Sequence, residues 1–152
     1  MDRFPEMAKQ GIASVVRPLR LSHGALMCRN LEKSRRFYEE FLGLEVVRHT
    51  RVSMMLRRET GTYIVCVRVG DAVPEQHIVN HWGLDVASRE EVDRARAEAQ
   101  RLQTKYEIRQ IKRAIVRHRA YGFYLHDLDN NWWEIQHEPR TIDQFFDRGD
   151  VV

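Results

Sequence analysis

The sequence predicts an α+β fold in which two βαβββ modules form a cupped, mixed sheet. Three observations lead to this prediction. The order strand, helix, then about three strands occurs twice along the chain of 152 residues. The two copies align at an offset of 58 residues, which places His23 over His81 and Cys28 over Val86. A single unit of this kind cannot bury its own sheet face, so the two copies are expected to pack together.

The first copy covers about residues 20–70. Its opening stretch, RLSHGALMC at residues 20–28, reads as a strand and leads to Asn30, a residue type that caps helix N-termini. Apolar residues then recur at helical spacing as far as Gly43, which suits the end of a helix. Three short strands are predicted to follow, at residues 44–49, 53–58 and 63–69.

The second copy covers about residues 78–137. The stretch IVNHWGLDVA at residues 78–87 predicts a strand, and Ser88 with Glu91 predicts a capping box at the start of a helix. The apolar face of that helix and the strands after it follow the order of the first copy. The helix face consists of Val92, Ala95, Ala99 and Leu102, and the strands are expected at residues 106–111, 120–127 and 131–136.

The ends of the chain lie outside this repeat. Residues 1–19 show no firm period and are predicted to be an N-terminal arm, which leaves residues 20–137 as one domain. In the tail, residues 138–152, Ile142, Phe145 and Phe146 fall at helical spacing. Exposed phenylalanines favour association, so the tail and the arm predict a homodimer.

Composition limits the class of protein. With 43% hydrophobic residues the chain can bury a core, and no run approaches the roughly 18 apolar residues that a membrane span needs. The charged start is unlike a secretory signal, so a soluble, cytoplasmic protein without a membrane partner is expected. Cys28 and Cys66 lie in apolar, strand-like runs and are predicted to be reduced core residues.

The net charge of +3 comes from a small excess of basic residues along a highly charged chain. The densest basic stretch, residues 108–119, suits either a nucleic-acid strip or a strand with a solvated face. No helix-turn-helix, zinc-finger or aromatic RNA-binding pattern accompanies it, so no nucleic-acid partner is expected.

Two histidines occupy equivalent places in the repeat. Because residues two apart in a strand share a face, His23 and His81 lie opposite the apolar positions that a helix would cover. They therefore lie on the concave face of each half, where a pseudo-twofold axis would bring the rings together. Glu134, in the otherwise apolar run NNWWEIQ, needs a cation or a salt bridge to an arginine. Beside two converging histidines, metal ligation is the better explanation.

The chain resembles the vicinal oxygen chelate superfamily of glyoxalases, extradiol dioxygenases, and fosfomycin- and bleomycin-resistance proteins. The resemblance covers roughly residues 20–137 and is carried by LSHGALMCRNLEKSRRFYEEFLGLEVV, NHWGLDVAS and GFYLHDLDNNWWEIQ. It implies a fold of two βαβββ modules cupped around a divalent metal. It also implies that His23, His81 and Glu134 are the metal ligands, and single-domain relatives commonly form dimers.

Within that family the pattern is most similar to a single-domain extradiol dioxygenase. Glyoxalase I and methylmalonyl-CoA epimerase have a fourth ligand, a Glu or Gln on the strand before the second histidine, and TYIVCVRV at residues 62–69 has none. A site of two histidines and one carboxylate leaves open positions that suit Fe(II). Two alternatives are a glyoxalase-like isomerase or fosfomycin-type transferase using Mn, Ni or Zn, and a non-catalytic small-molecule-binding protein. Bleomycin-resistance proteins bind in that last way but lack the three ligands.

The resemblance also implies roles near the metal. Tyr124, ten residues before Glu134, is expected either to contact the substrate oxygens or to pack among the hairpin aromatics. Extradiol dioxygenases have an acid/base histidine on the strand before the second metal histidine, where this chain has Cys66 instead. His118 and His77 are candidate substitutes for it or surface residues. A small aromatic substrate would be covered by residues that share the parity of the cup, namely Met27, Met54 and Trp132.

Overall fold

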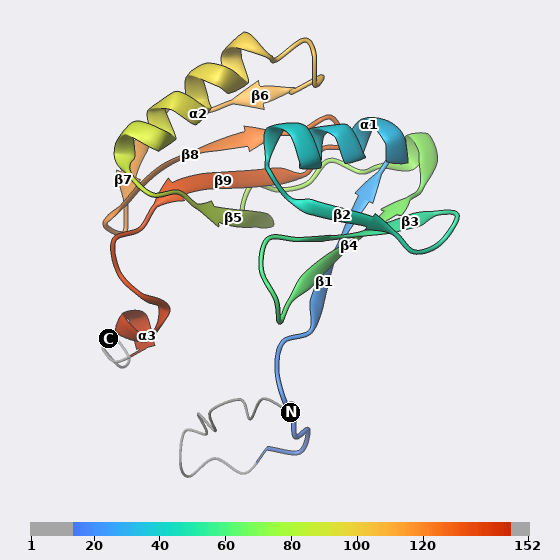
Figure 1. Cartoon of the computed structure of the whole chain (residues 1–152), viewed down its shortest axis with the longest axis horizontal. Helices are drawn as coiled ribbons and strands as arrows, with labels where there is room; N and C mark the ends of the chain where they lie inside the picture. Colours follow the sequence, from blue (N-terminus) through green and yellow to red (C-terminus); the bar gives the residue numbers. More distant parts are fainter. Residues whose placement is uncertain (1–13, 147–152) are drawn as a thin grey trace.

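The computed structural model describes residues 14–146 and contains a four-stranded and a five-stranded sheet that share the order of four strands (Figure 1). The first sheet has the order β1-β4-β3-β2, and the second has the order β5-β9-β8-β6, with β7 also paired to β8. In both sheets the first strand of the module lies parallel to the last, and the others are antiparallel. The predicted pair of βαβββ modules is therefore confirmed. The strands are β1 (His23–Cys28), β2 (Glu45–Arg48), β3 (Ser53–Arg57), β4 (Tyr63–Arg68), β5 (His81–Asp85), β6 (Gln110–Ile111), β7 (Ile115–Arg117), β8 (Ala120–His126) and β9 (Trp132–His137).

The helices begin where the sequence predicts. The Asn30 side chain accepts a hydrogen bond from the Lys33 amide at 3.0 Å, and α1 (Leu31–Arg36) starts there. It continues through a π-helical turn, η1 (Phe37–Phe41), before Gly43 turns the chain with φ of 70°. In the second module the Ser88 hydroxyl accepts from the Glu91 amide, and α2 (Arg89–Arg101) follows.

The segment after α2 differs from the prediction. The strand expected at residues 106–111 shrinks to the two residues of β6, because Glu107 adopts a positive φ of 55° and turns the chain. A further strand, β7, forms in the basic stretch and pairs with β8. His118 and Arg119 join them in a two-residue turn with φ of 49° and 75°, which is typical of tight hairpins.

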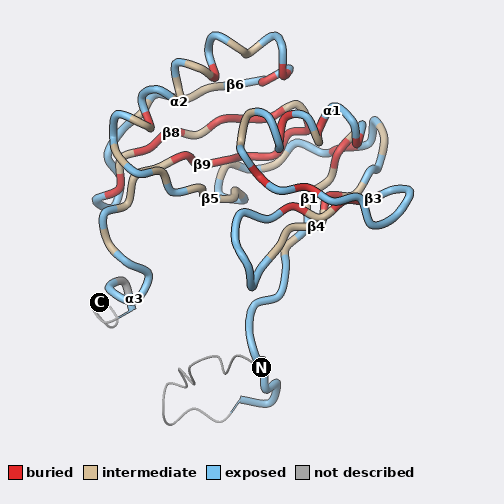
Figure 2. Tube along the Cα trace, viewed as in Figure 1, coloured by how far each residue is buried: buried red, intermediate tan, exposed pale blue. Residues whose placement is uncertain are grey.

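The apolar core lies between the two modules (Figure 2). Helix α2 packs on β8 and β9, and the rings of Tyr38 and Trp133 from different modules lie 5.7 Å apart. Cys28 and Cys66 are both free and fully buried in this core, as predicted for reduced structural cysteines. Burial of apolar surface from both halves is the main force that holds the modules together.

A buried polar loop ties the modules together as well. Asp129, after β8, accepts hydrogen bonds from the Arg29 amide at 2.8 Å and from the Ser34 hydroxyl at 2.5 Å. Asp127 accepts from two amides of its own loop and from the Trp133 indole. Burial, and then the charge of Asp129, raise the pKa of Asp127 to about 7.

The two sheets approach each other at their β1 and β5 edges. A Cβ atom built on Gly24 of β1 would lie 2.1 Å from the indole of Trp82 on β5, so only glycine fits there. The two sheets thus form the cup without being hydrogen-bonded into one.

Both ends of the described chain expose apolar side chains. Leu19 and Leu21 are almost fully exposed just before β1, and Ile142 and Phe146 are exposed on α3 (Ile142–Phe146). The side chain of Phe145 lies outside the described residues. In the part of the chain that is described, no helix is both long and apolar enough to cross a membrane.

Candidate functional site

The candidate site lies on the face of the second sheet that points away from α2. Across β5, β9 and β8, Gly83 pairs with Glu134 and Glu134 pairs with Tyr124. His81 pairs with the residue two before Glu134 and so shares its face. The alternate residues, including Trp133, face the core. The pleat of three strands therefore gathers an imidazole, a carboxylate and a phenol on one surface.

His81 and Glu134 form the centre of this surface. The His81 Nε2 and the Glu134 Oε2 are 3.3 Å apart, and 27% and 17% of the side chains are exposed. The Ile78 carbonyl lies 2.8 Å from the His81 Nδ1 and accepts a hydrogen bond from it, which turns Nε2 toward the carboxylate. Adjacent ligands bonded to one ion at about 2.1 Å lie roughly 3.0–3.4 Å apart. The chemistry and spacing of this donor pair therefore fit a divalent metal ion.

Tyr124 is the third member of the group. Its ring meets the His81 ring edge-on, with centroids 5.0 Å apart. Burial, and then the hydrogen bond to Glu134, raise the pKa of the Tyr124 phenol above its usual value. The phenol is therefore protonated at neutral pH and donates a hydrogen bond next to the carboxylate.

Two cations that the sequence does not single out lie over aromatic rings of β8 and β9. The Arg117 guanidinium is 5.0 Å from the centre of the Tyr124 ring, and the Lys112 ammonium is 5.7 Å from the centre of the Trp132 ring. Both belong to the basic stretch in which several residues are positively charged. The β7–β8 hairpin, which was not predicted, brings Arg117 to this face. The backbone bond from Lys112 to Tyr124 brings Lys112 there.

Trp132, predicted to line a substrate pocket, is mostly covered. It is 7% exposed, stacks on His126 with ring centroids 4.4 Å apart, and donates its indole hydrogen bond to the Gln76 carbonyl. His126 is a further residue near the site that the sequence did not predict. Its Nε2 is buried without a hydrogen-bond partner among the described residues, and burial lowers the pKa of its imidazole.

His23 does not contact His81 or Glu134 in the described structure. It is exposed, its Nδ1 lies 2.8 Å from the Ser22 hydroxyl, and its ring stacks on Tyr63 at 5.2 Å. Within residues 14–146, no group of three or more His, Cys, Asp or Glu side chains is arranged to hold a metal ion. One chain in this conformation thus brings together two of the three proposed ligands.

A cavity of about 460 Å³ lies between the β1 and β5 edges and reaches His81. Met27, a predicted pocket residue, does line it. Its other walls combine apolar residues of the first module with amides near β5, which suits a small, partly polar molecule. These walls include Ala25, Leu26, Val67, Gln76, Asn80, Trp82 and Asn131.

Three other predicted residues lie elsewhere. Met54, predicted in the pocket, is 1% exposed and packs in the core, because on β3 it pairs with Cys66, whose side chain faces inward. His118 is exposed in the hairpin turn, and no contact joins its imidazole to the site in the part of the chain that is described. His77 is exposed as well, and its Nδ1 accepts from the Val79 amide.

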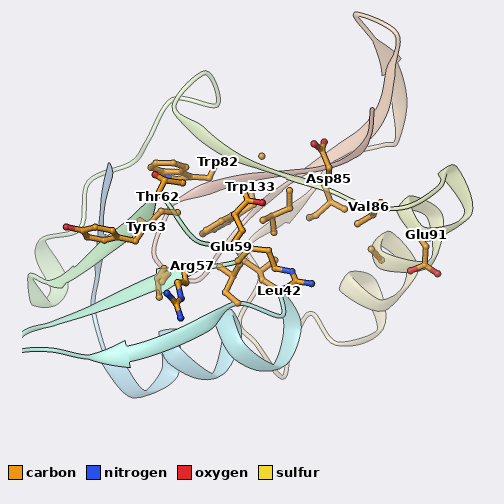
Figure 3. A pocket seen from close by; sticks show the side chains of 18 of the residues that line it. Leu42, Arg57, Glu59, Thr62, Tyr63, Trp82, Asp85, Val86, Glu91 and Trp133 are labelled. Carbon is orange, nitrogen blue, oxygen red and sulfur yellow. The ribbon is translucent and has the colours of Figure 1, made fainter. Parts of the chain in front are cut away.

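A larger cavity of about 600 Å³ lies on the core side of β5, between the β3–β4 hairpin and α2 (Figure 3). Trp82 borders both cavities, while Trp133 lies at the apolar floor of this one. Neither His81 nor Glu134 lines it, so it is separate from the candidate site.

Comparison with known proteins identifies a family match. The model of the Glyoxalase/Bleomycin resistance protein/Dioxygenase superfamily matches residues 20–135, which include all three proposed ligands. No curated protein matches the chain.

Solved structures share the fold. The fosfomycin resistance protein FosX of Listeria monocytogenes is 22% identical, with a TM-score of 0.65 over 87% of this chain and 99% of that chain. A hypothetical protein of S. aureus, SA1046, is 20% identical, with a TM-score of 0.61 over 79% and 98%. A glyoxalase/bleomycin resistance protein/dioxygenase of Alicyclobacillus acidocaldarius is 20% identical, with a TM-score of 0.57 over 86% and 98%.

Proposed function

The chain belongs to the glyoxalase/bleomycin resistance protein/dioxygenase superfamily, and on that premise we propose that it is a metal-dependent, extradiol-type dioxygenase that opens the ring of a small catechol. The observation that carries this proposal is the convergence of the His81 Nε2, the Glu134 carboxylate and the protonated Tyr124 phenol. An imidazole and a carboxylate supply two of the ligands for a divalent ion, and the phenol can contact an oxygen of a substrate next to them.

The proposed ion is Fe(II), held by His81, Glu134 and His23. Support comes from the Nδ1 partner of each histidine, because donation from Nδ1 leaves Nε2 able to act as a ligand: the Ile78 carbonyl beside His81 can only accept, and the Ser22 hydroxyl beside His23 can accept. With three protein ligands, Fe(II) would offer open coordination positions for the catechol and dioxygen and a path for the electrons, which the catechol itself supplies.

A second copy of the chain would complete the site. His23 is exposed and follows a segment whose Leu19 and Leu21 side chains have nothing to cover them in the described structure. Pairing of two chains through these surfaces would bury the leucines and bring His23 of one chain to the pair of the other. Sedimentation at micromolar concentration tests this, and a monomer would reject it.

The chain's own residues have separate tasks in this proposal. The Ile78 carbonyl orients the His81 ring through Nδ1. The protonated Tyr124 phenol donates to Glu134 in the free protein; once Glu134 binds the metal, the phenol would donate instead to an oxygen of the substrate and stabilise charge that develops there. The cavity beside His81, with Met27 in its wall, encloses the rest of the ring.

The second candidate is a redox-neutral reaction at the same site, either isomerisation or fosfomycin-type transfer with Mn, Ni or Zn. It is favoured by the lack of a histidine on β4, where Cys66 is buried in the core. A mutant of the Listeria monocytogenes FosX, which shares the fold, has been crystallised with Mn(II) and 1S,2S-dihydroxypropylphosphonic acid. Tyr124, His81 and Glu134 suit a substrate of that kind equally well.

The test begins with the metal content of protein purified without oxygen. A panel of catechols is then added with oxygen, and oxygen uptake and the yellow ring-opened product are followed. About one iron per chain, lost in His81→Ala, together with turnover, supports the dioxygenase. Bound metal without turnover on any catechol favours the isomerase or transferase. Catechol binding by metal-free protein would indicate a non-catalytic binding protein.

A further inference from the structure

We infer that Lys112 and Arg117 form a subsite for an acidic group, so that the substrate carries a carboxylate or phosphonate in addition to the oxygens that bind the metal. This inference rests on the proposed function, because it concerns the same cup. It names two residues whose basic side chains the metal chemistry itself does not need.

The two cations reach the site from neighbouring chain segments. The Lys112 amide donates to the Tyr124 carbonyl at 2.8 Å, which places this residue next to Tyr124 across the sheet. Its ammonium then lies over the Trp132 ring. Arg117, at the end of β7, places its guanidinium over the Tyr124 ring. Arg117 thus lies over the Tyr124 ring, and Lys112 lies over the ring of Trp132 on the next strand but one of the same face.

Neither cation is neutralised by the protein. Among the described residues no ion pair involves Lys112 or Arg117, although several other basic side chains are paired. Beside the second sheet, for example, Arg109 is 3.5 Å from Glu75, and Arg140 is 2.8 Å from Glu138. Unpaired cations beside the half-buried carboxylate of a proposed metal site indicate that the balancing negative charge comes with a ligand.

The other charged groups around the subsite do not supply that charge. Glu134 hydrogen-bonds to Tyr124 and is the proposed metal ligand. Glu75 faces Arg109 and His126, at the far side of the Trp132 ring. With a divalent ion in place the site would be strongly positive, which favours a substrate of charge −2 over a neutral one.

The guanidinium and ammonium suit an acid of small size. Arginine presents a planar fork that matches a carboxylate or phosphonate, and lysine adds a point charge. A catechol with a short acidic side chain could place its hydroxyls at the metal and its acid at these cations. A phosphonate without a catechol ring would use the same cations in the redox-neutral alternative.

The experiment compares binding of 3,4-dihydroxyphenylacetate and 4-methylcatechol to metal-loaded protein without oxygen, followed by tryptophan fluorescence. The acid is expected to bind at least tenfold more tightly than the neutral catechol. This preference should disappear in the double variant Lys112→Gln and Arg117→Gln, while Arg117→Lys keeps most of it. Arg113→Gln is the matched control, because Arg113 is an exposed neighbour on the same segment.

The possible results separate the two proposals. Equal affinity for the two catechols in the wild type overturns the subsite and leaves the dioxygenase proposal standing. If neither catechol binds, the dioxygenase proposal fails and propylphosphonate becomes the deciding probe. Binding of propylphosphonate that is lost in the double variant supports the subsite, and no binding overturns it. A similar loss in Arg113→Gln would also overturn it, because the effect would then be general surface charge.

Discussion

The two modules share a topology but differ on one face only. His23 of β1 pairs with Tyr63 of β4 just as His81 of β5 pairs with Trp132 of β9. Two residues further along, the strand β9 carries Glu134, whereas β4 carries Val65. The position equivalent to the metal carboxylate is therefore apolar in the first module.

The next strand continues the contrast. Tyr124 of β8 pairs with Glu134, and Met55 of β3 occupies the equivalent place beside Val65. The core faces remain alike, since Leu26 beside Cys66 corresponds to Leu84 beside Ile135. Packing requires apolar residues on the core side of both modules. The cup side is free to differ, and here the second module carries the polar groups while the first supplies a histidine and an apolar wall.

The largest effect is expected when the carboxylate charge that distinguishes the second module from the first is removed at Glu134. Glu134→Gln removes a proposed ligand charge, so metal affinity and turnover are expected to fall by at least about 100-fold. Metal content and steady-state rate measure the effect. Asp85→Asn is the control, because Asp85 lies on the same face but hydrogen-bonds to Gln136. Retention of full metal content in Glu134→Gln would remove Glu134 from the site.

The reverse change sharpens the comparison. Val65→Glu places a carboxylate at the first-module position equivalent to Glu134. If the first sheet faces the metal, a fourth ligand is expected to raise metal affinity and to lower oxygen-dependent turnover by about tenfold, because it occupies an open position. Titration with Mn(II) and the oxygen electrode measure both. Val65→Leu should change neither quantity. If Val65→Glu has the metal affinity and turnover of the wild type, this face lies away from the metal.

A third comparison concerns two glycines where the modules meet. Gly24→Ala would put a methyl group against the Trp82 indole, and such overpacking costs about 1–3 kcal/mol. Gly83, on β5, has no atom within 4 Å of the position of an added Cβ. Gly83→Ala is therefore expected to leave the free energy of unfolding nearly unchanged. Urea denaturation measures both variants, and equal effects would show that the contact between β1 and β5 is not tight.

Local signals predicted the frame of both modules. Asn30 and Ser88 accept capping hydrogen bonds from residues three further along the chain, and such pairs can be read directly from sequence. The alternation in residues 81–85 placed His81 away from the core correctly, because one face of that strand is clearly apolar. The position of His81, Glu134 and Tyr124 on one surface also follows from parity once the strands are known.

Features that depend on register or on long-range contact could not be predicted. In SMML at residues 53–56 both Met54 and Met55 are apolar, so the pattern does not say which faces the cup, and the prediction of Met54 was wrong by one residue. Lys112 and Arg117 lie among other basic residues, and their direction depends on the hairpin turn at His118. Whether His23 meets the pair depends on a second chain, which one sequence does not reveal.

The smallest expected effect tests the loop that joins the modules. The folded pKa of Asp127 is about 7, above the roughly 3.9 of an unfolded aspartate, because the carboxyl is buried next to Asp129. An acid whose pKa is raised on folding stabilises the fold fully below the unfolded value, and this stabilisation is lost as the pH rises through 7. Wild-type stability is thus expected to fall by about 1 kcal/mol from pH 6 to pH 7, relative to Asp127→Asn.

Urea denaturation of both proteins at pH 5, 6, 7 and 8 measures this difference, and the subtraction removes titrations that the two share. Asparagine keeps an oxygen for the two loop amides but loses the acceptor for the Trp133 indole, a cost that does not depend on pH. Parallel stability curves for the two proteins would mean that the three N–H donors hold Asp127 ionised in the fold. The loop would then join the modules through hydrogen bonds to a carboxylate, and the attachment of the second module to the first would not depend on pH near neutrality.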